Sequence, residues 1–133
     1  MAINVALVGV GNCAKSLVEG VAFYSRYHED TVGLMHPRIG GYHPRDLTFV
    51  AAFDVDARKV GRSLRAALYA EPNRTVHIAE PLPYSVTVQR GPTLDSIIPE
   101  AREFFIHESE QPVVDVAQVL RDAKAQVVVN YLP

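Results

Sequence analysis

The stretch that decides the fold is VALVGVGNCAKSL, residues 5–17. The segment Ile3–Val8 is rich in strand-forming residues and apolar on both faces, which is typical of a strand buried in a parallel sheet. After the glycines, apolar residues recur at helical spacing and predict a helix from about Asn12 to Tyr24. The spaced residues are Ala14, Leu17, Val18 and Val21. A buried strand that turns directly into an amphipathic helix predicts an α/β fold.

The turn itself has the form Gly9-x-Gly11-x-x-Ala14. In a dinucleotide-binding loop the first glycine permits the turn, the second lets the backbone approach a pyrophosphate, and the small third residue allows close helix–strand packing. The amides of Asn12 and Cys13 would then point at the ligand from the helix N-terminus. A merely structural tight turn is the alternative. The position between a strand and a helix favours nucleotide binding.

The remainder of the chain continues the same alternation. The stretch LTFVAAFDVD at residues 47–56 contains a second buried strand, which ends at Asp54. A helix over about 57–70 follows, with Asp56 as its cap. A third strand is predicted over 85–91, and residues 71–84 form a loop with room for a short edge strand. The segment 97–110 is ambiguous and contains some helix.

The last part of the chain predicts one more helix and one more strand. Asp115 and Gln118 have the spacing of a capping box before a helix that uses Val116 and Val119, and AQVVVNYLP at 125–133 reads as a fourth buried strand. The order predicts a Rossmann-type parallel sheet with helices on both faces, as an incomplete doubly wound fold. A strand buried on both faces needs a covering helix, so either this strand lies at an edge or the chain is part of a longer protein.

Asp54 is the candidate residue for binding a ribose hydroxyl. A dinucleotide fold places an acid at the tip of its second strand, about 20 residues beyond the glycines. Here the gap is longer, and an irregular insert at about residues 25–47 accounts for it. The charge of Asp54 would repel a 2′-phosphate and favours NAD over NADP, although Arg58 and Lys59 soften that preference. The alternative is that Asp54 is only a turn residue.

Composition narrows the class of protein. The net charge of −2 and the absence of a Lys/Arg cluster argue against nucleic acid and anionic membranes as main partners. No apolar run approaches membrane-spanning length. The single cysteine cannot form an internal disulfide, so a reducing, cytoplasmic setting is expected. The five histidines have no metal-ligand spacing, and we expect no metal site.

Other conspicuous side chains leave the chemistry open. Cys13 reads as a small residue beside the phosphates, although a helix N-terminus could lower its pKa. Arg90 and Thr93 could meet a ligand at the end of the third strand, or could belong to a turn with a threonine helix cap. No paired carboxylates or nucleophile motif appear, so the catalytic residues are unknown.

Four segments together resemble myo-inositol-1-phosphate synthase of the bacterial and archaeal type. They are VGVGNCAKSLVEGVAFY (8–24), GLMHPRIGGYHPRDLTFVAAFDVDARKVG (33–61), VQRGPTLDSI (88–97) and VVVNYLP (127–133). The resemblance covers almost the whole chain. It implies an NAD-dependent isomerase that converts glucose 6-phosphate to 1L-myo-inositol 1-phosphate by oxidation, intramolecular aldol closure and reduction, with NAD recycled within each turnover. It further implies a homotetramer, whose catalytic and tetramerisation domain is absent from this chain.

The resemblance also assigns residues to the cofactor. It places Asp54 at the adenosine ribose, Tyr131, Leu132 and Pro133 beside the cofactor, and five residues at the pyrophosphate, namely Gly9, Gly11, Asn12, Cys13 and Ala14. Lys15 departs from the family, where a small polar residue is usual. That leaves room for a cyclase acting on another sugar phosphate. An ordinary NAD-dependent dehydrogenase and a free-standing NAD-binding module over residues 1–133 are the remaining alternatives.

Overall fold

The described residues form a parallel four-stranded sheet. The computed structural model describes residues 2–27, 32–94, 97–100 and 105–132. Within them the strand order is β3-β2-β1-β4, and every neighbouring pair is parallel. The strands are β1 (Ile3–Val8), β2 (Leu47–Asp54), β3 (Val88–Arg90) and β4 (Val127–Asn130). The predicted α/β class with a Rossmann-type sheet is confirmed.

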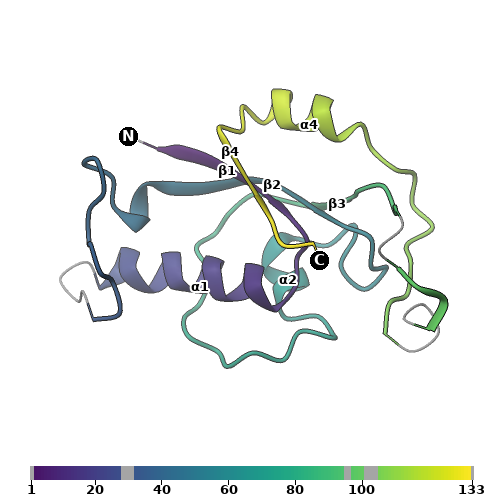
Figure 1. Cartoon of the computed structure of the whole chain (residues 1–133), viewed down its shortest axis with the longest axis horizontal. Helices are drawn as coiled ribbons and strands as arrows, with labels where there is room; N and C mark the ends of the chain where they lie inside the picture. Colours follow the sequence, from purple (N-terminus) through teal and green to yellow (C-terminus); the bar gives the residue numbers. More distant parts are fainter. Residues whose placement is uncertain (1, 28–31, 95–96, 101–104, 133) are drawn as a thin grey trace.

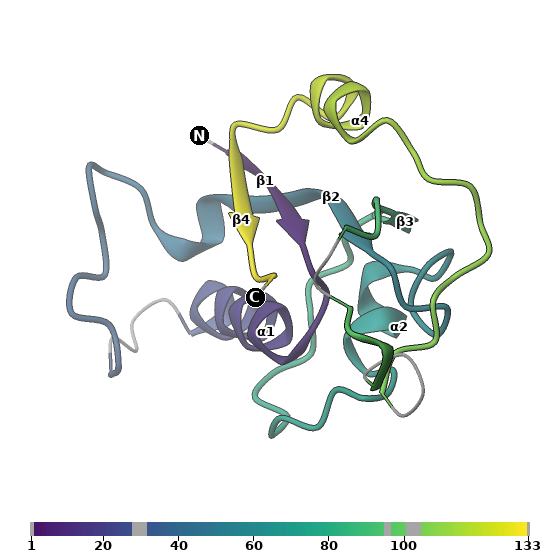
Figure 2. The ribbon, with the colours of Figure 1, turned by 45° about the vertical axis from the view of Figure 1, so that its right-hand side comes forward.

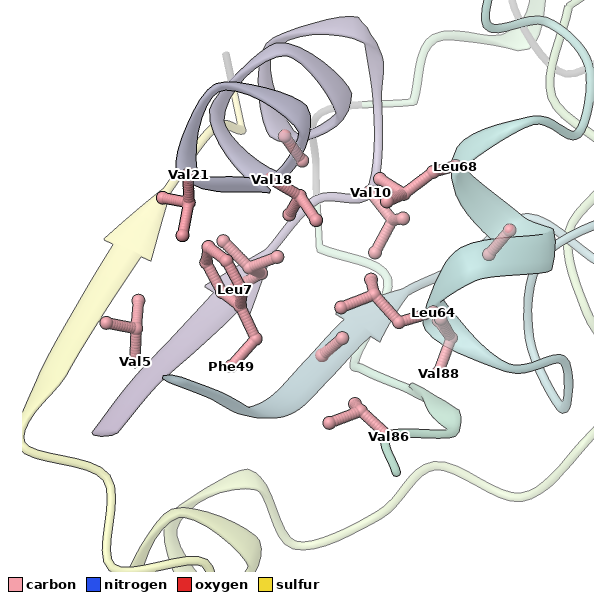
Figure 3. Packing of buried hydrophobic residues seen from close by; sticks show 13 residues of the cluster. Val5, Leu7, Val10, Val18, Val21, Phe49, Leu64, Leu68, Val86 and Val88 are labelled. Carbon is pink, nitrogen blue, oxygen red and sulfur yellow. The ribbon is translucent and has the colours of Figure 1, made fainter. Parts of the chain in front are cut away.

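Helices cover both faces of this sheet, as predicted. Figure 1 shows α1 (Asn12–Arg26) and α2 (Leu64–Leu68) on one face and α4 (Val116–Asp122) on the other. The larger core lies between β1, β2, α1 and α2, where Leu7 and Phe49 pack under Val18 (Figure 3). A smaller cluster under α4 contains Ala6, Ala51 and Phe53. Successive residues of β1 therefore point into different cores, which explains why Val5–Val8 are all apolar.

The predicted helix over 57–70, with Asp56 as its cap, is wrong in its first half. Gly61 has a φ of +83°, and its amide donates to the Val88 carbonyl at 2.8 Å. The amide of Leu64 likewise donates to the Val86 carbonyl. These two amides therefore pair with residues 86–88, and the single turn that begins at Asp56 does not continue as a helix. The helix begins only at Leu64, with the Ser63 side chain as its cap.

Other boundaries also differ from the prediction. β3 spans only Val88–Arg90, and no strand forms within residues 71–84. β4 was expected to be buried, but it lies at the edge of the described sheet, and Val127 and Val128 are about half exposed. Positions 99–100 are helical, and residues 101–104 of that predicted helix lie outside the described residues. Asp115 caps α4 by accepting from the Gln118 amide at 2.9 Å, but the predicted capping box is only half formed, because the Gln118 side chain bonds Asp122 and Arg121 instead.

The insert leads away from the glycine loop. α1 runs two residues further than expected, to Arg26, and the chain returns through a short 3-10 helix at Pro44–Asp46 directly before β2. Figure 1 shows this excursion at the end of the sheet where β1 and β2 begin. Because β1 and β2 pair from Ile3 with Leu47 through Val8 with Phe53, Asp54 arrives beside the glycine loop despite the long sequence gap.

Candidate functional site

The glycine loop leaves β1 through a conformation that requires glycine. Gly9 has a φ of +88°, and its amide donates to the Phe53 carbonyl at 2.9 Å. A Cβ at Gly9 would lie 3.4 Å from the Leu132 Cδ2 atom and 3.5 Å from the Tyr131 carbonyl carbon. The end of β4 therefore packs closely over this glycine (Figure 2). Gly9 serves the fold directly, whatever ligand the loop holds.

Gly11 differs, because nothing in the described structure needs it to be glycine. Its φ of −92° is open to any residue, and a Cβ there would have no heavy atom within 4 Å. Gly11 is also the N-cap of α1, and no side chain makes a cap hydrogen bond there. The start of a 15-residue helix thus has no side-chain cap, and the backbone is bare at its N-cap. Such a site suits an anion.

Val10, between the two glycines, is held on both sides by side chains from elsewhere. Its amide donates to Asp54 Oδ2 at 2.8 Å. Its carbonyl accepts from Lys59 Nζ at 2.8 Å and from Asn73 Nδ2 at 3.0 Å. Its own side chain is fully buried in the core of Figure 3. The loop is therefore fixed in shape before any ligand arrives.

Asp54 lies at the end of β2, where the sequence predicted it. Besides the Val10 amide, its carboxylate accepts from the amides of Val55 at 2.8 Å and Asp56 at 2.9 Å, both through Oδ1. The residue thus organises the loop as well as standing at the predicted ribose position. A carboxylate offers about four acceptor positions, so these three bonds leave room for one hydroxyl.

Two hollows flank the glycine loop. The first is an apolar cavity of about 250 Å³ at the carboxyl ends of β1, β2 and β3. It is lined by Val8, Gly9, Phe53, Asp54, Val55, Gly91, Pro92, Leu94, Val116 and Leu132. The second is a more open hollow of about 470 Å³ beside the start of α1 and the end of β4, lined by Asn12, Cys13, Ser16, Leu17, Thr75 and Tyr131. Gly9 and Asp54 thus border one hollow, and Asn12 and Cys13 the other.

The remaining predicted pyrophosphate residues take different positions. Ala14 is fully buried against the core, which fits the small third residue of the fingerprint. Cys13 is exposed in the first turn of α1. The side chain of Asn12 faces the protein, because its Oδ1 accepts from the amides of Arg74 at 2.8 Å and Thr75 at 3.2 Å. It ties the segment 73–78 to the start of α1.

The end of β4 supplies two of the three residues expected there. The Tyr131 amide donates to the Val8 carbonyl at 2.8 Å, and the Leu132 amide to Asn130 Oδ1 at 2.9 Å. Burial raises the pKa of the Tyr131 hydroxyl. Pro133 lies outside the described residues. Both described residues border a hollow, so this part of the predicted site is assembled around the loop.

The sequence interpretation assumed that Arg58 and Lys59 are free beside Asp54, but in the structure both are bound to other groups. Arg58 binds Asp56 through two nitrogens, at 2.6 and 2.9 Å, and also donates to the Phe105 carbonyl. Burial opposes the charge of Asp56, but the hydrogen bonds from Arg58 outweigh it and lower the pKa of Asp56. Lys59 is buried behind the loop. Arg58 is therefore bound to Asp56 and not free beside Asp54.

Arg90 and Thr93 bond to other parts of the protein, and Thr93 contacts Glu108 rather than forming the predicted helix cap. Arg90 Nη2 lies 3.0 Å from a carboxylate oxygen of Glu108, and Nη1 donates to the Gln111 carbonyl at 2.7 Å. The Thr93 hydroxyl donates to the same Glu108 oxygen. These bonds fasten residues 108–111 to the end of β3.

Sequence reasoning missed Asn73 and Thr75 and misplaced Lys59. Asn73 and Thr75 stand in an aperiodic loop, where no pattern marks a contact to residues some 60 positions earlier. Lys59 lies in a segment predicted as helix, where a lysine is normally solvated. Across the described residues, no three potential metal-ligating side chains gather in one place, and no helix is long and apolar enough to cross a membrane.

The strand order, the glycine turn between β1 and α1 and the acid at the end of β2 together define a Rossmann-type α/β domain. The chain is similar to curated inositol-3-phosphate synthases: 53% identical to that of Mycolicibacterium smegmatis, 52% to that of Mycobacterium tuberculosis and 50% to that of Corynebacterium glutamicum. Each match covers 98% of this chain and 36% of the relative, so the chain spans about a third of these proteins. The resemblance predicted from the sequence is confirmed. No protein-family profile matches the chain.

Solved structures give the same fold. A protein described as Ari2 superposes with a TM-score of 0.76 at 31% identity, over 100% of this chain and 39% of that one. A myo-inositol-1-phosphate synthase-related protein from Thermotoga maritima superposes with a TM-score of 0.72 at 18% identity, over 99% of this chain and 35% of that one. At that identity the second match speaks for the fold alone.

Proposed function

We propose that this chain is the NAD-binding part of an inositol-phosphate synthase. The observation that carries the proposal is the bare backbone at Gly11, at the uncapped start of α1, in a loop whose shape is already fixed. An uncapped helix N-terminus favours an anion, and the lack of a Cβ lets a bulky diphosphate approach the amides. The identity of 50–53% to named inositol-3-phosphate synthases supplies the reaction.

The two hollows fit the two halves of a dinucleotide. The apolar cavity beside Asp54 suits an adenine, with the carboxylate available to a ribose hydroxyl. The pyrophosphate would lie over Gly11 and the amides of Asn12 and Cys13. The open hollow bordered by Tyr131 would take the nicotinamide side. When bound, NAD would accept a hydride from the substrate and return it within one turnover.

The same geometry favours NAD over NADP. Asp54 is a carboxylate at the ribose position, and a 2′-phosphate there would meet its negative charge. Arg58 is committed to Asp56 through two hydrogen bonds, so its guanidinium is not free to compensate that charge. We expect NADP to bind at least about tenfold more weakly than NAD, which corresponds to about 1.4 kcal/mol.

The proposed substrate is glucose 6-phosphate, and the proposed product is 1L-myo-inositol 1-phosphate. Oxidation of a hydroxyl of the open-chain sugar phosphate would acidify the adjacent carbon, the enolate would add to the aldehyde carbon and close the carbon ring, and the ketone would then be reduced. The proposal takes the acid–base groups and the phosphate site from parts of the synthase other than these 133 residues. It also includes a homotetramer and a cytoplasmic setting. The chain's own contribution is to hold and orient the dinucleotide.

The first experiment measures NAD affinity by calorimetry in the purified protein and two variants. Gly11→Val puts a branched side chain where the pyrophosphate would lie, and the free protein accommodates it because no described atom is within 4 Å. Gly20→Val makes the same change on α1 away from the site, where the space is equally open. Loss of binding in Gly11→Val alone supports the proposal. Equal affinity in both variants would refute the assignment of the loop.

The second experiment tests the reaction. The full-length protein is incubated with glucose 6-phosphate and a stoichiometric amount of NAD, and inositol phosphate and NADH are both followed. Product in excess of NAD, with no accumulation of NADH, supports the synthase. Equimolar accumulation of NADH would indicate an ordinary dehydrogenase. Binding of NAD without any conversion of sugar phosphates would indicate a binding module.

A further inference from the structure

Lys59 is a buried cation directly behind the glycine loop. Its side chain is 4% exposed, and its ammonium donates to the Val10 carbonyl at 2.8 Å and to Asn73 Oδ1 at 3.1 Å. Asn73 in turn donates to the same Val10 carbonyl and to the Leu68 carbonyl, both at 3.0 Å. A lysine is almost never fully buried unless its charge is compensated, because removing an ammonium group from water costs free energy.

The charges around Lys59 do not neutralise it by direct contact. No salt bridge joins its ammonium to a carboxylate among the described residues, although Asp54 and Asp56 act on it from the end of β2. Arg58 stands next to it in the chain and opposes its charge. Burial lowers the pKa of Lys59, and the two aspartates counteract that effect only in part. The inner side of the loop therefore holds an under-compensated positive charge.

The outer side of the same loop is the place proposed for a diphosphate. Lys59 reaches the carbonyl of Val10, and the next residue is the bare Gly11 at the start of α1. A charge a few ångströms away in a poorly solvated environment interacts far more strongly than it would in water. An anion at the loop would supply the compensation that the protein itself leaves incomplete.

We propose that Lys59 is a positioning residue for the dinucleotide, which fixes the glycine loop through Val10 and attracts the anionic ligand from behind it. The inference rests on the proposed NAD-binding function. The Lys59 side chain then has two roles, a hydrogen bond to the Val10 carbonyl and an electrostatic attraction for the ligand. A neutral amine could still donate a hydrogen bond to Val10, but only the protonated form attracts the anion. The dependence of affinity on pH therefore distinguishes charge from structure.

The test measures the Kd for NAD by calorimetry between pH 7 and 10.5 in the intact protein. All proteins carry Cys13→Ser, which removes the exposed thiol beside the proposed pyrophosphate position. The parent protein, which keeps Lys59, should lose affinity for NAD as the pH rises through the pKa of Lys59. The affinity of Lys59→Arg for NAD should not change with pH, because the guanidinium group keeps its charge. Lys59→Met should bind about tenfold or more weakly at pH 7, with no pH dependence.

Lys15→Met is the matched control for a merely structural effect. Lys15 is also buried, but its ammonium donates to the carbonyls of Thr75 and Val76, away from the loop. Its variant should keep the pH profile of the parent protein even where its thermal stability falls. If the parent and Lys59→Arg show the same profile, the inference is wrong. If the parent does not bind NAD at all, the proposed function fails first. Should Lys59→Met not fold, the parent and Lys59→Arg still decide the question.

Discussion

Replacing the buried carboxylate Glu19 should cost the protein much of its stability. Glu19 lies on α1 and is fully buried. It accepts from the Tyr69 hydroxyl at 2.6 Å, the Ile78 amide at 3.0 Å and His77 Nδ1 at 3.0 Å, and it pairs with Lys15 at 3.3 Å. The perturbation is Glu19→Gln, which keeps the shape of the side chain and removes its charge.

The magnitude follows from what the substitution leaves behind. Lys15 is itself buried and would keep its charge with the carbonyls of Thr75 and Val76 and the ring of Tyr69 as partners. Breaking one side of a buried ion pair typically costs about 3–5 kcal/mol, and we expect about 3 kcal/mol because glutamine retains one acceptor. Lys15→Met should cost only about 1 kcal/mol, since Glu19 keeps its other donors. The double variant should lose less than the sum by about 1 kcal/mol or more, because no unpaired charge remains.

The pH dependence gives a second, independent check. Burial opposes the ionisation of Glu19, but the bonds from Tyr69, Ile78, His77 and Lys15 outweigh it, so the pKa lies below the ordinary value of 4.5. A carboxylate with a lowered pKa contributes stability that is complete above its unfolded pKa and lost as pH falls through the folded one. The difference between wild type and Glu19→Gln should stay constant from neutral pH to about 5 and shrink in more acidic buffer.

Urea unfolding followed by circular dichroism, at several pH values, measures both effects. The four proteins of the cycle are wild type, the two single variants and the double variant. A cost below about 1 kcal/mol for Glu19→Gln would mean that water replaces the lost bonds and that the site is not buried in solution. A difference that persists unchanged at pH 3 would mean that the charge contributes nothing.

Three further predictions concern single residues. Gly9→Ala should cost about 1–2 kcal/mol in thermal unfolding because of the positive φ, whereas Gly20→Ala should stabilise by up to about 1 kcal/mol. Tyr84→Phe should be neutral or stabilise by up to about 1 kcal/mol in the same assay, because its hydroxyl is buried without a partner in the described structure, an environment that raises its pKa to about 12. Alkylation of Cys13, followed by mass spectrometry, should slow about tenfold at NAD concentrations of ten times the Kd, and an unchanged rate would place the ligand elsewhere.

The parts of the fold that repeat a local pattern could be predicted from the sequence. β1 matches its predicted range and β2 ends at Asp54 as predicted, because each is a largely apolar run buried between two helical layers. The helix after Asp56 failed because backbone pairing between Gly61 and Val88 outweighed helix propensity in residues 57–63. β4 was expected to be buried from the same kind of apolar run, but burial depends on what packs against a strand, and composition alone does not reveal that.

The candidate site, like the fold, could be predicted from the sequence only in part. The fingerprint Gly9-x-Gly11 and Asp54 could be recognised because their roles depend on backbone geometry at fixed points of the fold. What fixes the loop could not be recognised, since Lys59 and Asn73 reach Val10 from 49 and 63 positions away in the chain. Asn73 belongs to the segment 73–78, which Asn12 and Glu19 fasten along α1. The aperiodic loop that sequence reasoning left without a role is therefore the element that joins the glycine loop to the helix behind it.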